Sequence, residues 1–120
     1  MMKRIDITGV HYEVNEELKR YIRKKIGKLE DYMPPHSRKS VHAEVKLREN
    51  AKKNKQQCTC EVVLHLPHEI LTVHESTETM FAAVDIVENK LKTQLKKYKE
   101  LHHPSRQRVL VRRVLGRVRR

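Results

Sequence analysis

Lysine side chains gather toward one end of a long stretch, Ser76 to Leu101, whose apolar spacing predicts a helix. Five lysines lie between positions 90 and 99, whereas the acidic residues lie mostly in the first half. An ammonium group is a compact positive charge that binds phosphate. This order suits the helix dipole, yet five lysines in ten residues exceed what the dipole requires. The pattern therefore predicts a helix that offers cations to a polyanion.

The whole chain shares this basic character, with a formal net charge of +12 over 120 residues. Residues 102–120 contribute +7 and residues 34–57 contribute +5, while the predicted helical segments 16–33 and 77–101 contribute only +2 and +1. The excess positive charge thus lies in residues 34–57, in residues 102–120 and on selected faces of the two predicted helices. Such a surface indicates an anionic partner, either nucleic acid or a membrane. RNA fits better than DNA, because the chain has no recognition-helix, zinc-finger or basic-zipper pattern.

Two other groups of residues could carry chemistry, the cysteines and the histidines. Cys58 and Cys60 should share one face of a strand, and without a second ligand pair they are expected to be reduced core residues. His65 and His74 should point to the opposite, solvated face of the sheet. The chain has no nucleophile elbow and no glycine-rich phosphate loop. We therefore expect no enzyme activity, no metal, no cofactor and no small-molecule substrate.

Alternating apolar residues predict four strands, over residues 3–10, 40–48, 58–66 and 69–75. A helix capped by Asn15 should follow the first strand and end at Pro34-Pro35. Ser76 or Thr77 should cap the last helix, and the polar residues 49–57 predict a mobile hairpin loop. The last helix should bury one apolar stripe, made of Phe81, Val84, Val87, Leu91, Leu95 and Tyr98.

This order predicts an α+β fold, β-α-β-β-β-α, because each strand and each helix has one apolar face to bury. A four-stranded sheet should carry both helices on one face, as a two-layer sandwich. Residues 1–103 should form this domain, followed by an arginine-rich tail over residues 104–120. No apolar run reaches the length of a membrane span, and the first residues lack the apolar core of a secretory signal, so we expect a cytoplasmic protein.

The tail holds seven arginines and no acidic residue, so it could order on RNA or lie as an amphipathic helix on a membrane. It lacks the tryptophan and phenylalanine that interfacial helices usually carry, which favours RNA. Arg112 and Arg113 are the tail residues that we expect to contact RNA.

Several short motifs in a fixed order resemble one family. They are Thr8-Gly9 before Asn15 to Lys19, Lys28 to Tyr32, Leu66-Pro67, and Met80 to Asp85 before Lys90-Leu91 and Gln94-Leu95. Together, over residues 3–101, they resemble the short form of the ribosome hibernation-promoting factors, also called ribosome-associated translation inhibitors.

The resemblance implies a protein that binds the small ribosomal subunit and its rRNA, in the channel of messenger RNA and of the A- and P-site transfer RNAs. Such proteins block translation under stress by occupancy. Thr93 stands where the family commonly has an arginine, which puts one phosphate contact in doubt. The chain should lack the dimerising domain of long members and be a monomer in solution. Carried over by position, the RNA-binding residues, which should lie side by side on the two helices, are Lys19, Lys25, Lys28, Lys90, Gln94 and Lys97.

A double-stranded-RNA-binding module is the alternative, because it also orders a helix, three strands and a helix. Those modules place basic residues at the start of the last helix, where they meet phosphates. Here Ser76 to Thr79 includes Glu78 and no basic residue. This counts against duplex recognition but leaves it open.

Overall fold

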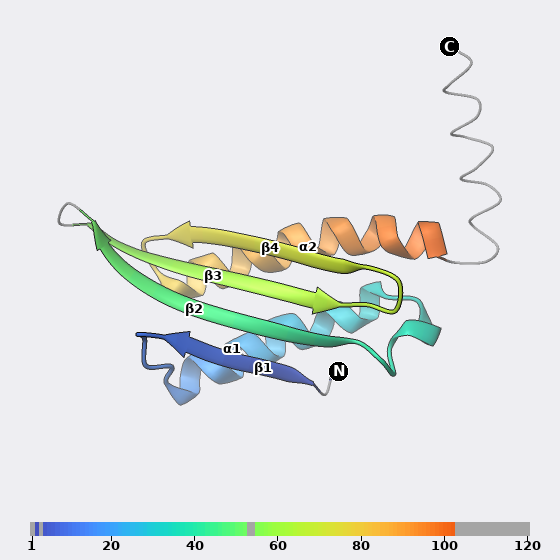
Figure 1. Ribbon diagram of the computed structural model, residues 1–120, viewed down its shortest axis with the longest axis horizontal. Helices are drawn as coiled ribbons and strands as arrows, with labels where there is room; N and C mark the ends of the chain where they lie inside the picture. The colour runs from blue at the N-terminus through green and yellow to red at the C-terminus, as the bar shows by residue number, and fades with distance from the viewer. Residues whose placement is uncertain (1, 3, 53–54, 103–120) are drawn as a thin grey trace, which may run out of the picture.

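The computed structural model describes residue 2, residues 4–52 and residues 55–102, apart from the side chains of 51, 52, 55, 56 and 102. Within these residues the chain forms four strands and two α-helices in the predicted order (Figure 1). Two short 3₁₀ helices, η1 (Lys28–Tyr32) and η2 (Pro35–Ser37), connect α1 to β2. The predicted tail, residues 104–120, lies outside the described residues. The bounds of the main elements are β1 Ile5–Val10, α1 Glu16–Gly27, β2 His42–Lys52, β3 Lys55–His65, β4 Ile70–Thr77 and α2 Met80–His102.

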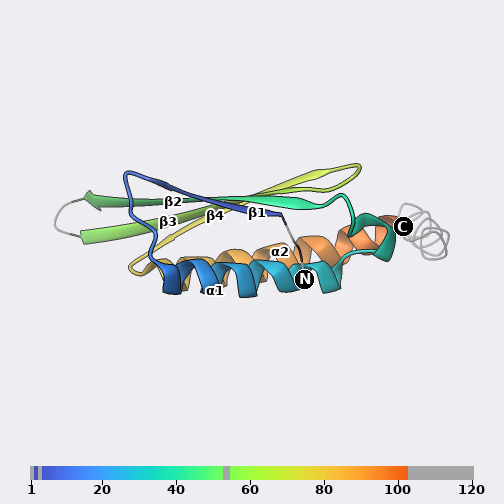
Figure 2. The ribbon, with the colours of Figure 1, turned by 90° about the horizontal axis from the view of Figure 1, so that it is seen from below.

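The strands form one sheet in the order β1-β2-β3-β4. The pairs β2–β3 and β3–β4 are antiparallel, whereas β1 lies parallel to β2 because α1 carries the chain back between them. Both helices cover the same face of the sheet (Figure 2). The predicted α+β two-layer sandwich is confirmed.

The core lies between the two layers. Inward side chains such as Val62 and Leu64 on β3, Ile22 on α1 and Leu91 on α2 have no exposed surface. Burying an aliphatic side chain of this kind stabilises the fold by about 1.5–3 kcal/mol. No helix in the described part of the chain is both long and apolar enough to cross a membrane.

Cys58 and Cys60 are free thiols in this core, as the sequence predicts. Burial raises the pKa of both, and that of Cys60 to about 12. Because the thiolate is the reactive form, both cysteines are structural residues at neutral pH.

Asn15 caps α1, since its side-chain oxygen accepts a hydrogen bond from the backbone N–H of Leu18 at 2.8 Å. Glu16 and Glu17 follow in the first turn, where they complement the helix dipole. The predicted helix continues as the 3₁₀ helix η1 from Lys28 onward. The buried stripe consists of Leu18, Ile22, Ile26, Leu29 and Met33.

The helix α2 begins later than predicted. Ser76 and Thr77 end β4 instead of capping α2, because they pair with Thr59 and Cys58 of β3. The cap is Thr79, whose hydroxyl oxygen accepts the N–H of Ala82 at 3.2 Å.

The predicted apolar stripe of α2 is correct at five of its six positions. Phe81 is 37% exposed, since it lies at the border of the helix against the ring of Tyr21, with ring centroids 4.9 Å apart. Met80 and Ala83 are buried instead. The five buried positions are Val84, Val87, Leu91, Leu95 and Tyr98.

The predicted hairpin loop over residues 49–57 is wrong at most of its positions. There β2 runs on to Lys52 and β3 begins at Lys55, with Glu49 paired to Cys58 and Asn50 to Gln57. Residues 53 and 54 lie outside the described residues. Backbone pairing in a hairpin does not require apolar side chains, so polar residues extend both strands beyond β1 and β4 (Figure 1).

Candidate nucleic-acid interface

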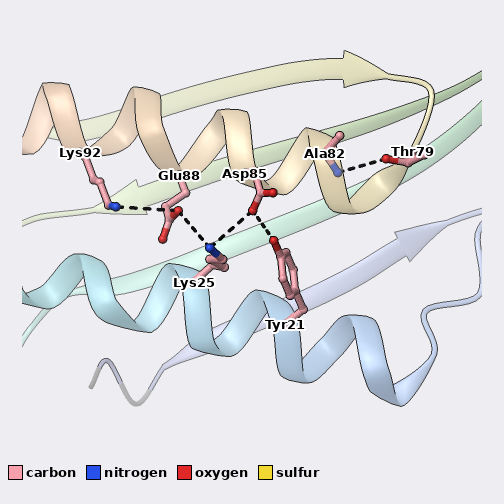
Figure 3. A network of polar contacts seen from close by, with 7 residues as sticks. All are labelled: Tyr21, Lys25, Thr79, Ala82, Asp85, Glu88 and Lys92. Atoms are coloured by element: carbon pink, nitrogen blue, oxygen red, sulfur yellow. Dashed lines mark hydrogen bonds and ion pairs between the residues drawn. The ribbon is translucent and has the colours of Figure 1, made fainter.

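The helices α1 and α2 face each other across a group of charged side chains (Figure 3). Lys25 on α1 lies 3.7 Å from an oxygen of Asp85 and 3.9 Å from an oxygen of Glu88. Lys92, one turn along α2, lies 3.9 Å from the same Glu88 oxygen, and Tyr21 donates a hydrogen bond to Asp85. We call these five residues the interhelical network. It holds the two helices in register with each other.

Burial makes the Glu88 carboxylate of this network depend on its partners. The Glu88 side chain is 7% exposed, and a carboxylate in that position is costly unless it is paired. The hydrogen bond to Asp85, followed by burial and the nearby negative charges, raises the pKa of the Tyr21 hydroxyl to about 12. Tyr21 therefore remains a donor at neutral pH.

Cations also gather around Tyr32 in η1. The ammonium nitrogens of Lys92 and Lys96 lie 5.6 Å and 5.9 Å from the centroid of the Tyr32 ring, within the range of cation–π attraction. Lys25 lies in the same way over the ring of Tyr21, at 5.5 Å. This flank of α2 therefore presents positive charge beside aromatic rings.

The opposite flank of α2 forms a groove with β4. Its volume is about 490 Å³. Lys90, at one side of the groove, also pairs with Glu75, and the hydrogen bond from Lys90 lowers the pKa of that carboxyl group. Hydroxyl, amide and ammonium groups are among the side-chain groups that contact nucleic-acid phosphates and sugars. The residues of this α2–β4 groove are Thr72, Val73, His74, Lys90, Thr93, Gln94 and Lys97.

The structure divides the predicted RNA-binding residues between these two flanks. Lys90, Gln94 and Lys97 line the α2–β4 groove, whereas Lys25 belongs to the interhelical network. The helix α2 therefore does not set its three predicted residues beside the lysines of α1. Because two residues turn a helix by about 200°, Lys92 lies on the α1 side and Lys90 on the other.

The other predicted residues are placed as follows. Lys28 is exposed directly after α1, and Lys19 lies 3.5 Å from Glu16 in the first turn of that helix. Arg112 and Arg113 lie outside the described residues.

Sequence reasoning missed most of the interhelical network. Tyr21 and Asp85 are 64 residues apart, and nothing in either neighbourhood indicates the hydrogen bond between them. The pair Glu88 and Lys92 has the four-residue spacing of a helical ion pair, so this part of the network had a signal in the sequence.

Two solved structures have the same fold. A ribosomal subunit interface protein from Coxiella burnetii superposes with a TM-score of 0.67 at 23% identity, covering 81% of this chain and 98% of that one. The N-terminal domain of Protein Y from Thermus thermophilus gives a TM-score of 0.62 at 22% identity, covering 80% and 99%. In fold, the chain is therefore of the same class as ribosomal subunit interface proteins.

The family can be stated more closely from sequence. The family described as Sigma 54 modulation protein / S30EA ribosomal protein matches residues 5–102, and this chain belongs to it. A curated relative, the ribosome hibernation promotion factor of Staphylococcus aureus (strain COL), is 32% identical over 108 residues. That alignment covers 89% of this chain but 54% of the relative, so the chain spans about half of the relative's length.

These findings confirm the family that the sequence motifs indicated. They also agree with the prediction that the chain is not an enzyme. They give no support to the alternative of a double-stranded-RNA-binding module.

Proposed function

We propose that this chain is a cytoplasmic hibernation factor that binds the small ribosomal subunit through its rRNA. It occupies the channel of messenger RNA and of the A- and P-site transfer RNAs, and so blocks translation under stress. Membership in the S30EA family supports this, as does a relative whose name is ribosome hibernation promotion factor.

The structural observation that carries the proposal is the position of lysines on both flanks of α2. Lys92 and Lys96 lie beside η1, and Lys90 and Lys97 lie beside β4. RNA lying along α2 would therefore meet ammonium groups from either side. Each phosphate neutralised in this way releases counterions, so binding weakens as salt rises.

Inhibition in this proposal requires no reaction. The interhelical network fixes α1 against α2, so the two helices present a preorganised surface to the rRNA. The protein then competes with messenger RNA and transfer RNA for the same space.

Sedimentation with purified small subunits at low salt tests the proposal. The variant K90E/K97E reverses two charges of the α2–β4 groove and should weaken binding about tenfold or more. The matched control is K46E/R48E, which makes the same change of charge on exposed residues of β2, in the other layer. It should bind nearly as well as the parent.

Two results would contradict the proposal. The parent chain could fail to sediment with the small subunit at low salt, which would remove ribosome binding altogether. Alternatively, both variants could lose affinity equally, which would mean that net charge and not the helical layer determines binding.

A further inference from the structure

Three side chains with metal-binding atoms meet on the face of the sheet that is opposite the helices. His42 and Glu44 lie two residues apart on β2, so both point to the same face. His65 on β3 is the direct cross-strand partner of His42. The imidazole nitrogens and a carboxylate oxygen of these three residues lie within 4.8 Å of one another.

One nitrogen of this cluster lacks a hydrogen-bond partner in the described part of the chain. The Nε2 atom of His65 is shielded from solvent and has no hydrogen-bond partner among the described residues. An oxygen of Glu44 lies 3.5 Å away without forming a hydrogen bond. The ring of His65 stacks on that of His42, with centroids 4.2 Å apart and planes within 8°. A shielded nitrogen without a partner costs free energy, which a bound cation would recover.

We propose that His42, Glu44 and His65 bind a divalent transition-metal cation of the Zn²⁺ type. Two imidazoles and one carboxylate are ligands that zinc accepts, at about 2.0–2.2 Å from the metal. In a tetrahedral site the ligand atoms lie about 3.3 Å from one another. The three side chains therefore close from their present spacing by tilting the two rings out of their stack, and water fills the fourth position.

The surroundings favour a cation at this point. Asp6 on β1 is the register partner of Glu44, so a second carboxylate lies on the same face next to the cluster. The ligands come from neighbouring strands, and the bound ion would join β2 to β3 at the end of the sheet where β2 begins. The cluster lies on the sheet face that α1 and α2 leave uncovered (Figure 2). None of its three residues lines the α2–β4 groove.

Titration of the full chain with Co²⁺, followed by displacement with Zn²⁺, tests this site. The absorption bands of Co²⁺ report its ligands directly, and the expected result is one saturable ion per chain. Single variants H42Q, E44Q and H65Q should each lower the affinity about tenfold or more. Thermal melting of each variant without metal shows whether it is folded. If one variant fails to fold, the metal affinities of the other two still test the site.

Two controls separate this cluster from other histidines. His74 is the register partner of Glu61 on the same sheet face, and among the described residues it belongs to no cluster of three metal-ligating side chains, so H74Q should bind like the parent. The double variant H102Q/H103Q removes the only adjacent histidines in the sequence and should also bind like the parent. The proposal is overturned if H42Q and H65Q keep the parent affinity, if either control loses it, or if the parent shows no saturable binding of one ion.

Discussion

Three lysines that were predicted to meet RNA already have carboxylate partners within the fold, and one of them, Lys19, has its partner Glu16 in the same helical turn. Lys25 lies between Asp85 and Glu88, and Lys90 pairs with Glu75. Their charges are partly compensated, so their contribution to RNA affinity depends on whether those partners release them. The partner of a lysine thus matters as much as its exposure.

Glu75 should therefore limit the affinity for rRNA. In the variant E75Q, Lys90 loses its competing carboxylate, and binding to small subunits should tighten several-fold at low salt. A double-mutant cycle with K90Q checks the cause, because the gain from E75Q should vanish once Lys90 is gone. If E75Q tightens binding equally in both backgrounds, the effect comes from net charge and not from Lys90.

The hydroxyl group of Tyr21 should lose its proton at a higher pH than that of an ordinary tyrosine. Its ordinary pKa of 10.0 is raised to about 12 by the hydrogen bond to Asp85, so this bond stabilises the fold fully below pH 10. The stabilisation is lost as the pH rises from 10 to about 12, because the folded protein holds the proton longer than the unfolded chain does.

Ultraviolet titration of tyrosinate checks this prediction. Tyr21→Phe should remove the phase near pH 12 and leave the remaining phases unchanged. As a control, Tyr12→Phe should leave the phase near pH 12 in place. Loss of a phase near pH 10 in Tyr21→Phe would show that the hydrogen bond is absent in solution.

Residue types and spacing predicted the cationic character of α2 and the two buried cysteines. They could not predict the partners of individual lysines, because a partner such as Asp85 for Lys25 comes from another helix and depends on how the two helices pack on the sheet. The His42 and His65 pair was missed for a similar reason, since their contact requires the register of β2 with β3.

Substitutions at Glu88 and at its lysine partners test how α1 is held against α2. Removing its charge with E88Q should cost about 1 kcal/mol or less, because Lys25 and Lys92 are both 32% exposed and can turn to water. Removing both lysines with K25M/K92M leaves the buried carboxylate without a partner and should cost about 3 kcal/mol.

Urea unfolding at neutral pH measures this asymmetry. The double variant K24M/K97M removes two lysines that are exposed on the same helices, and should change stability little. Equal losses for E88Q and K25M/K92M would contradict the view that the burial of Glu88 dominates the network.

The elements themselves were largely predictable, because strands and helices with one apolar face have clear periodicities. The residues at which these strands and helices end were less predictable. Residues 49–52, three of them polar, extend β2 because their backbone groups pair with β3. Ser76 and Thr77 extend β4 for the same reason. Hydrophobic pattern reports which face is buried, but it does not report where hydrogen-bonded pairing stops.

At the scale of the whole molecule, the basic tail remains a prediction, since residues 103–120 lie outside the described part of the chain. Deleting residues 104–120 removes seven arginines. The slope of log affinity against log salt should then fall by about 0.7–0.9 for each phosphate that the protein no longer neutralises. Salt titration of small-subunit binding measures this slope, and a footprint on the rRNA should show that the binding site is unchanged. A slope equal to that of the intact chain would exclude the tail from the interface.

The parallel pairing of β1 with β2 has a consequence for how the chain folds as it is synthesised. Ile5 pairs with Ala43, 38 residues later, whereas β2, β3 and β4 form two antiparallel pairs between consecutive segments. At about 5–20 residues per second, the first strand waits several seconds for its partner. The first strand to be synthesised therefore joins the sheet only after β2 has been made, and during this time α1 is the element that connects the two strands.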